Sequence, residues 1–316
     1  MVAKIDLISE ASHKHAGEVT ALAFDGDHLY SGSADGVINM WSKDLQFNRE
    51  IPVHKDFAVL ALVANSHKQL YSCGRDGSLR YFRRPWSHDN NDILLQTVQD
   101  DVTALYIAND VLFSGDDKGI VTKWYHNQVG AQYNVAEEVK SMAVEENNLY
   151  TVRETDVQIT DITPHMMSQV TKGVIPGRAP LILFGTQKPF IPDSVPMGRR
   201  ASYVPEIIKT KKYVVSATRD GKGIVVSNNG TFKVLATKEN AHTMIINVMC
   251  ELDDFLITAG FDGKVKKWKD LETKPVLVEE IDTGKCINAL IAGPEQSSSV
   301  FVGDSDGFVK RLKFSA

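Results

Sequence analysis

A short hairpin pattern that recurs along the chain constrains the fold more than any other feature. Its clearest copy, YSGSADGVINMW, spans 30–41. Related stretches occur at 71–82, 113–124, 215–227, 257–268 and 301–312, with a weaker copy at 150–162. In most copies, a strand of β-branched, aromatic or small residues meets Asp-Gly or a similar pair, and a second alternating strand follows. The pattern indicates tight β-hairpins, in which glycine allows the positive φ of the turn.

The spacing of the hairpins indicates a repeat. Most turn residues lie 37 to 44 residues apart, and the longer step of 65 residues, from Thr155 to Asp220, indicates one unit plus an insertion. The turn residues are Asp35, Asp76, Lys118 (with Asp117 beside it), Thr155, Asp220, Asp262 and Asp306. An apolar strand precedes most hairpins and a more polar strand lies between units. Four strands per unit at this period predict propeller blades, because one such sheet cannot bury both faces alone.

The units resemble WD40 repeats. That family joins a His before the first strand, a Ser or Thr on the second, an Asp in the turn and a Trp on the third in a buried hydrogen-bond relay. The matching residues are His15, Ser31, Asp35 and Trp41; His54, Ser72 and Asp76; and His242, Thr258, Asp262 and Trp268. Phe82 replaces Trp in the second unit and has no indole N–H, so that relay is expected to stop at the hydroxyl. The other units keep only parts of the pattern.

The resemblance implies one all-β domain over 1–316, a seven-bladed WD40-type β-propeller. The composition, with 43% hydrophobic residues in 316, supplies enough apolar mass for a large core. In the family, an N-terminal strand completes the last blade. Lys4–Ser9 is the candidate for that strand, and it would pair both sheet edges and close the ring.

A proline-rich segment, 172–203, contains the predicted insertion. An ungapped alignment of Val204–Gly221 with Val19–Gly36 places it before blade five, in a connection that opens on the top face in the family. Its apolar run, Leu181–Phe184, fits no blade position in this register. Two interpretations remain open: a partner-binding arm or cap over the channel, and a surface loop packed on the rim.

Ser202 is a candidate phosphorylation site within the same segment. It follows Arg199-Arg200-Ala201, which resembles the recognition sequence of a basophilic kinase. A phosphate there would add negative charge beside two arginines and could reorder the segment. The alternative interpretation is a solvated basic end of a loop.

The sequence contains no motif of catalysis or metal binding that we recognise. The nine histidines do not cluster, and HExxH, paired CxxC, GxSxG and Walker motifs are absent. We therefore expect a protein that is not an enzyme and that needs no cofactor or metal. The formal net charge of −5 does not favour a direct nucleic-acid partner or an acidic membrane.

The expected location is the cytoplasm, with the nucleus as an alternative. Neither a signal peptide nor an apolar run of membrane-spanning length is evident. Cys73, Cys250 and Cys286 are odd in number and widely spaced, which is typical of free thiols in a reducing compartment.

In the family, the residue just before each turn residue points into the top rim. These residues are Ala34, Arg75, Asp117, Glu154, Arg219, Phe261 and Ser305. Arg75, Arg219 and Phe261 are the binding candidates, because arginine and aromatic residues are the usual anchors of interfaces. Together they would suit an extended, partly acidic peptide. The alternative is that the arginines pair with Asp117 or Glu154 across the rim.

A second candidate site follows the second hairpin. Phe82-Arg83-Arg84-Pro85-Trp86 resembles the FRRG motif of phosphoinositide-binding propellers, with Pro85 in place of glycine. Two arginines can hold a phosphate. The alternative is a loop that leaves the blade and partly exposes Trp86.

The sequence therefore predicts a non-catalytic scaffold or adaptor that docks protein or peptide partners on its top face, as part of a multiprotein complex. A phosphate-binding or phosphoinositide-binding propeller that uses Arg83 and Arg84 is one alternative. A constitutive structural subunit of a larger assembly is the other.

Overall fold

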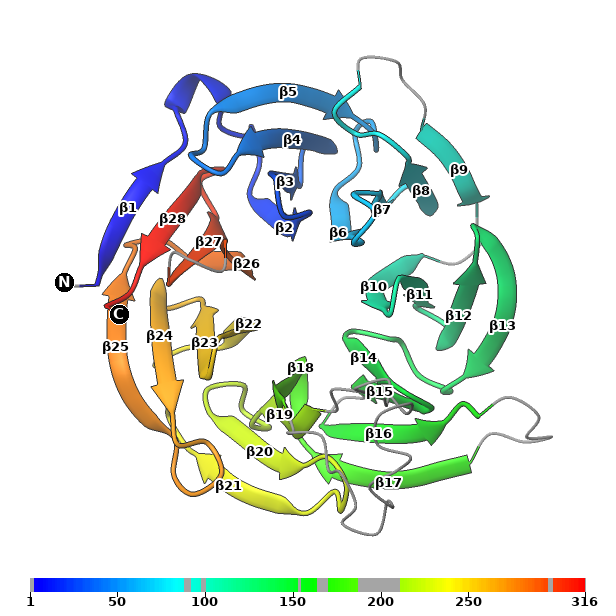
Figure 1. Ribbon diagram of the computed structural model, residues 1–316, viewed down its shortest axis with the longest axis vertical. Coiled ribbons are helices and arrows are strands. Elements are labelled where there is room, and N and C mark those ends of the chain that lie inside the picture. Colours follow the sequence, from blue (N-terminus) through cyan, green and yellow to red (C-terminus); the bar gives the residue numbers. More distant parts are fainter. Residues whose placement is uncertain are drawn as a thin grey trace, which may run out of the picture.

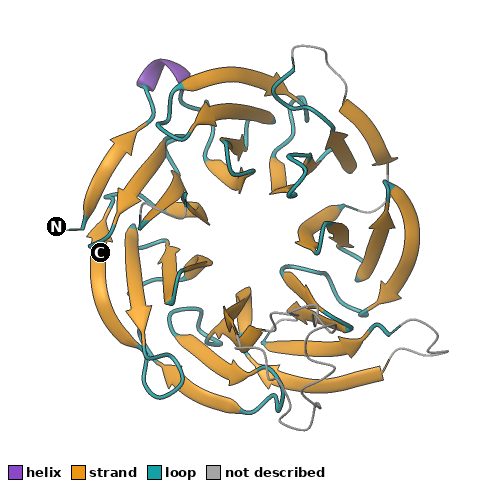
Figure 2. Cartoon of the chain, viewed as in Figure 1, coloured by secondary structure: helices purple, strands orange, loops and turns teal. Residues whose placement is uncertain are grey.

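Seven antiparallel sheets of four strands each are arranged in a ring in the computed structural model (Figure 1). The structure describes residues 3–87, 92–97, 101–152, 155–163, 170–186, 211–294 and 298–315. Strands make up nearly all of the regular structure in these ranges, and the short 3-10 helix η1 (Ala11–His13) is the exception (Figure 2). The predicted all-β, seven-bladed propeller is confirmed.

Six of the seven blades are continuous in sequence, with the first strand innermost. Blade one contains β2 (Val19–Phe24), β3 (His28–Ser33), β4 (Val37–Ser42) and β5 (Phe47–Pro52). Blade two contains β6 (Val59–Ala64), β7 (Leu70–Gly74), β8 (Ser78–Phe82) and β9 (Asp92–Thr97). Blade three contains β10 (Val102–Ala108), β11 (Val111–Asp116), β12 (Ile120–Tyr125) and β13 (Gln128–Asn134).

The other three continuous blades follow the same order. Blade four contains β14 (Met142–Glu145), β15 (Asn148–Val152), β16 (Asp156–Asp161) and β17 (Val170–Pro176). Blade five contains β18 (Arg178–Thr186), β19 (Lys211–Ala217), β20 (Ile224–Asn228) and β21 (Val234–Lys238). Blade six contains β22 (Ile246–Leu252), β23 (Phe255–Gly260), β24 (Lys264–Lys269) and β25 (Val276–Asp282).

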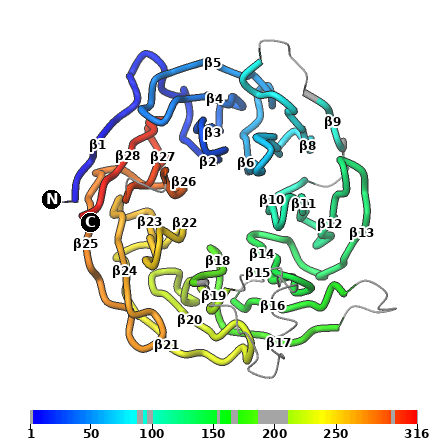
Figure 3. Tube along the Cα trace, viewed as in Figure 1, coloured from blue at the N-terminus to red at the C-terminus, as the bar shows by residue number. Residues whose placement is uncertain are grey.

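Blade seven combines the two ends of the chain. It contains β26 (Ile287–Ala292), β27 (Ser299–Asp304), β28 (Val309–Lys313) and, outermost, β1 (Lys4–Ile8). The blue β1 lies beside the red β28 in Figure 3, and the two strands are antiparallel. The predicted closure of the ring by the N-terminal strand is confirmed.

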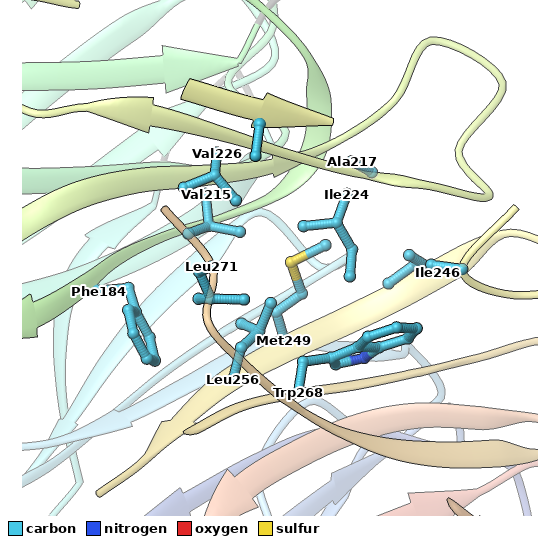
Figure 4. Close-up of a cluster of buried hydrophobic side chains, with 12 residues drawn as sticks. Phe184, Val215, Ala217, Ile224, Val226, Ile246, Met249, Leu256, Trp268 and Leu271 are labelled. Carbon is cyan, nitrogen blue, oxygen red and sulfur yellow. The ribbon is translucent and has the colours of Figure 1, made fainter. Parts of the chain in front are cut away.

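The hydrophobic core is divided into seven layers, one between each pair of neighbouring blades. In the layer between blades five and six, Val215 and Ile224 from blade five pack against Met249, Leu256 and Trp268 from blade six (Figure 4). Each blade therefore buries both of its faces against its neighbours, which explains why a single repeat cannot be stable alone.

A β-bulge near the start of most innermost strands connects neighbouring blades. Thr20 in blade one donates its hydroxyl hydrogen to the carbonyl oxygen of Val59 in blade two, at 2.6 Å. Thr103 bonds in the same way to Val139 at 2.8 Å, from blade three to the chain leading into blade four. Leu60 occupies the equivalent bulge in blade two and has no polar group to donate.

Blade five begins earlier than the alignment from Val204 predicts. Residues 170–176 form β17, and 178–186 form β18, so 172–186 belongs largely to the propeller rather than to an insertion. Leu181 and Phe184 are each 5% exposed. Pro180 concealed this strand, because proline inside an apolar run argues against a central strand. It is accommodated here at the bulge between Arg178 and Leu181.

The extra residues of blade five therefore follow its first strand. We call the ends of the blades that carry the Asp turns the top face, and the opposite ends the bottom face. Thr186 pairs with Lys211 at the end of the sheet opposite the Asp220 turn, so the connection from β18 to β19 leaves from the bottom face and not from the top. Residues 187–210, with Ser202 and Val204, lie outside the described residues.

Candidate functional site

Three histidine relays connect the turns of the top face to the strands of the propeller. In blade one, His15 Nε2 lies 2.7 Å from Ser31 Oγ, and the indole N–H of Trp41 donates to the same oxygen at 2.8 Å. Blade six repeats this arrangement, with His242 Nε2 at 2.7 Å from Thr258 Oγ1 and the Trp268 N–H at 2.9 Å. The side chains of this relay are almost completely buried.

The relay in blade two ends at its hydroxyl group. His54 Nε2 lies 2.9 Å from Ser72 Oγ, and His54 Nδ1 lies 2.8 Å from Asp76. Phe82 lies in the Trp position and has no N–H to continue the chain. The aspartate of this relay also accepts a hydrogen bond from the backbone N–H of Ser78, which fixes the turn.

The chemistry of the relay selects one histidine tautomer. In blade six, Thr258 Oγ1 accepts from Trp268, so its own hydrogen is available for His242 Nε2. The proton of the neutral ring then lies on Nδ1 and faces Asp262 at 3.0 Å. Burial lowers the pKa of His242 although Asp262 opposes the shift, which favours this neutral form.

The relay of blade one is looser at its acidic end. His15 Nδ1 is 3.5 Å from Asp35 and makes no hydrogen bond. Asp35 instead accepts backbone N–H groups from Ala16 and Val37, at 2.9 and 3.0 Å. Burial alone would raise the pKa of Asp35, but the His15 ring nearby and these N–H groups lower it to about 2.

Blades with an incomplete relay use other bonds. Trp124 in blade three donates to Ser114 Oγ at 2.9 Å. In blade seven, Asp304 and Lys310 form a buried ion pair at 2.8 Å. In blade five, Thr218 Oγ1 donates to Asp220 at 2.6 Å. These blades therefore keep local bonds near their turns even where the relay has been lost.

Backbone hydrogen bonds place the predicted rim residues in equivalent positions. In five blades, the N–H of the rim residue donates to a carbonyl just before or at the start of the innermost strand of the same blade. The donor residues are Ala34, Arg75, Asp117, Phe261 and Ser305, at 2.9 to 3.0 Å. This shared anchor makes the rim rigid, and the side chains of Arg75 and Phe261 are exposed above it.

The structure places the turns that carry two of the three predicted binding residues against one connection, although the Arg219 guanidinium itself lies nearest Asp156 at the start of β16 in blade four. The turn of blade five that carries Arg219 bonds to the connection into blade six, where His242 N donates to Lys222 O at 2.8 Å. Phe261 N bonds to Ile245 O in that same connection. Arg75 lies in blade two, three blades away around the ring, and does not join them.

The alternative of a rim ion pair applies differently to the two arginines. Arg219 lies 3.8 Å from Asp156, and both side chains are exposed, so this pair contributes little to stability. Arg75 lines a hollow of about 430 Å³ between blades two and three with Asp101 and Asp117. Glu154 lies outside the described residues.

Sequence reasoning missed two exposed apolar residues of the top face. Met244 is 50% exposed and belongs to the same connection that holds Phe261, which is itself 47% exposed. Phe57 is 49% exposed in the connection into blade two. Both follow a relay histidine by two or three positions, and that spacing is the signal that could have identified them.

Residues 82–86 lie at the opposite, bottom face. Arg83 and Arg84 are both exposed, but only Arg83 lines the hollow beside this loop. Trp86 is 39% exposed, and its ring stacks on His28 of blade one with centroids 6.2 Å apart.

Within the described residues, no helix has both the length and the apolar composition of a membrane-spanning segment. Nor do three His, Cys, Asp or Glu side chains gather, anywhere in the described ranges, so that they could hold a metal ion.

Comparisons with known proteins agree with this architecture. Residues 9–42, which include the first relay, match the family model described as "WD domain, G-beta repeat". A Lotus japonicus protein named "Putative E3 ubiquitin-protein ligase LIN-1" is 23% identical over 318 residues, covering 98% of this chain. This chain spans only 19% of that protein's length.

Two solved structures share the fold. The WD40 β-propeller domain of Doa1 matches with a TM-score of 0.74 and 16% identity, over 99% of this chain and 97% of that domain. The computationally designed Ika8 protein matches with a TM-score of 0.63 and 19% identity, over 96% and 98% of the two chains. At these identities the likeness concerns the fold alone.

Proposed function

The chain is a WD40-repeat β-propeller, and we propose that it is a non-catalytic scaffold that docks a protein partner on its top face. Propellers of this family generally act as platforms for protein interactions. The proposal goes further, because it assigns the docking to one sector of the rim. We call this sector the five–six patch and define it as Arg219, Met244 and Phe261.

The observation that supports this proposal is the exposure of apolar side chains on a rigid support. Met244 and Phe261 each leave about half of their surface in solvent, although Phe261 N bonds to Ile245 O, and Thr243 N, on the other side of Met244, bonds to Asp262. Arg219 adds a largely exposed guanidinium on blade five, where it lies on the side of blade four, 3.8 Å from Asp156. Aromatic and arginine side chains that are already positioned lose little entropy on binding, and therefore suit an interface.

The patch favours a partner that presents an apolar side chain next to a carboxylate. Phe261 and Met244 would cover the apolar group, while Arg219 would exchange its weak contact with Asp156 for the partner's carboxylate. Arg75 lies too far around the ring for a contact within the patch. We assign it to a second contact, used only by a partner that reaches across the mouth of the ring.

Affinity purification followed by mass spectrometry tests the proposal. The baits are the wild type, Arg219→Glu/Phe261→Ala, Arg75→Glu and the control Lys233→Glu, an exposed residue between β20 and β21 at the bottom of blade five. We expect a reproducible partner that is lost with the double variant and retained with Lys233→Glu. Loss with Arg75→Glu as well would mean that the partner crosses the ring.

Each bait must first show the unfolding midpoint of the wild type, which is reasonable to require because every substituted side chain is exposed. If all wild-type partners remain bound to both top-face variants, the five–six patch is not the docking surface. If they remain bound to the patch variant and dissociate only from Lys233→Glu, docking belongs to the bottom face.

A further inference from the structure

A hollow of about 630 Å³ lies between blades two and three on the bottom face. Tyr71, Tyr81 and Trp124 line it, and they belong to the apolar layer between these blades. Each is less than a tenth exposed. Ile93 and Tyr125 line the same hollow with about half of their surface in solvent. The volume lies within the range of about 300–1,000 Å³ that is typical of ligand pockets.

Hydrogen bonds between the two blades fix the positions of the walls of this hollow relative to each other. The backbone N–H and the hydroxyl of Ser66 in blade two both donate to Asp110 in blade three, at 3.0 and 2.8 Å. Tyr71 Oη donates to Asn127 Oδ1 of blade three at 3.2 Å. A ligand would therefore meet a site that already exists and would lose little free energy in ordering it.

Arg83 supplies a positive charge at the edge of the hollow. Its side chain is exposed, and no acidic partner for it occurs within the ranges that the structure describes. The Asp110 carboxylate, in contrast, is engaged by Ser66 and lies 3.9 Å from His67. An aromatic floor with such a guanidinium at its edge is complementary to an apolar group that carries a nearby negative charge.

We propose that this hollow, the two–three groove, binds a linear peptide of a partner protein that carries an apolar side chain beside a carboxylate. The apolar side chain inserts over Tyr71 and Tyr81, and the carboxylate pairs with Arg83. The exposed side chains of Ile93 and Tyr125 contact the peptide residues on either side of the inserted one. This site is separate from the five–six patch, since the two lie on opposite faces of the ring.

The chemistry of the groove favours a peptide over a phosphorylated headgroup. Only one of the two adjacent arginines lines it, and Asp110 would repel a polyanion. The floor is built from aromatic rings, which contribute to binding mainly through buried apolar area. A phosphate would leave that surface uncovered.

Selection of peptides on the whole 316-residue chain tests this proposal. Phage that display random linear dodecamers are selected on the immobilised wild type, and each enriched peptide is then measured by fluorescence anisotropy. We expect enriched peptides to carry Asp or Glu close to an aliphatic or aromatic residue. Arg83→Glu should weaken their binding about tenfold or more, the loss expected for one charge-assisted pair.

Arg84→Glu provides a matched control, because it makes the same charge change one residue away and outside the groove. It should leave peptide affinity close to that of the wild type, while Tyr125→Ser should weaken it. The proposal is overturned if no peptide class is enriched, or if the peptides bind Arg83→Glu and Arg84→Glu equally well. Phosphoinositide vesicles that are released by both arginine variants, with no peptide enriched, would replace it with a phosphate site.

Discussion

Ser31 and Ser72 occupy the same place in blades one and two but have different numbers of buried partners. Ser31 Oγ is hydrogen-bonded to His15 and Trp41, whereas Ser72 Oγ is bonded to His54, and Phe82 in the Trp position has no N–H to donate to it. An unsatisfied buried donor or acceptor costs about 1–3 kcal/mol. The contribution of each relay to the free energy of unfolding therefore depends on how many buried groups lose their hydrogen-bond partner when the relay is broken.

This difference predicts unequal effects of one substitution. Ser31→Ala orphans two buried groups and should lower the free energy of unfolding by about 2–4 kcal/mol. Ser72→Ala orphans one and should cost about 1–2 kcal/mol. Urea unfolding followed by tryptophan fluorescence measures both. Equal losses would show that the indole bond in blade one contributes nothing.

The relay of blade six also predicts how stability depends on pH. Burial lowers the pKa of folded His242 below its ordinary value of 6.5. As the pH falls through 6.5, His242 therefore binds a proton in the unfolded chain but not in the folded chain. The free energy of unfolding decreases as a result. Urea unfolding at pH 7.5 and 5.5 should show this loss in the wild type. His242→Gln should be less stable at pH 7.5 but show a smaller loss between the two pH values, and an unchanged loss would contradict the assignment.

At the scale of the strand, bulges and turns connect neighbouring blades. The bulges of β2 and β10 face the next blade, and the Asp-Gly turn of blade one lies against the backbone that leads into blade two. A Cβ on Gly36 would come within 2.1 Å of the His54 carbonyl oxygen. Glycine is required there by close approach as well as by its φ of 80°.

The bulge of blade two allows the contribution of the hydroxyl bond to be measured. Leu60→Thr would place a hydroxyl where Thr20 and Thr103 carry theirs, with the Val102 carbonyl as the equivalent acceptor. Leu60→Val is the control, because it has the same shape without the hydroxyl. We expect the Thr variant to exceed the Val variant by about 0.5–1.5 kcal/mol in chemical unfolding. A Thr variant no more stable than the Val variant would show that no bond forms.

Two glycines separate the effects of strain and contact. Gly26 has a φ of 93°, and a Cβ added there would meet no atom within 4 Å, whereas Gly36 combines positive φ with the contact to His54. Gly26→Ala should cost about 1 kcal/mol, for the dihedral alone. Gly36→Ala should cost about 1–3 kcal/mol more, for overpacking. Similar unfolding free energies for the two variants would assign the whole effect to φ.

At the scale of the molecule, stability depends on closing the ring. β1 covers the outer edge of β28, and Asp6 forms ion pairs with Arg311 and Lys313 at 2.7 and 3.2 Å. Ile5 and Leu7 add apolar contacts to the layers on either side of blade seven. Without β1, the edge of β28 would be open to pairing with another chain.

Removing residues 1–9 should therefore lower the thermal unfolding midpoint and promote self-association. A synthetic peptide of residues 1–10, added in excess, should restore both towards the values of the untruncated 316-residue chain, because a ligand that binds only the folded state stabilises it. The same peptide with Ile5→Ser and Leu7→Ser is the control and should rescue poorly. Rescue by both peptides alike would show that packing of these side chains does not contribute.

Much of this architecture could be predicted from local sequence. Asp-Gly turns at a regular spacing identified the hairpins. The resemblance to WD40 repeats implied the relays, including His15 with Asp35 and His242 with Asp262, which the structure places 3.5 and 3.0 Å apart. These signals are readable because turn geometry and hydroxyl–imidazole chemistry accept few residue types. β18 escaped prediction because Pro180 interrupts its alternation.

The sequence by itself determined how many blades form and in what order, because strand period and turn chemistry are local properties. That an N-terminal strand completes the last blade was implied by the resemblance to WD40 repeats, since that pairing joins the two ends of the chain. Only the tertiary structure decided which surface residues meet. Phe261 is held against the connection that carries Met244 by the bond from its N–H to Ile245 O, and the two–three groove arises where two blades pack side by side. Such contacts depend on how neighbouring sheets are placed in space, and that placement results from the packing of seven separate apolar layers, not from any single stretch of chain.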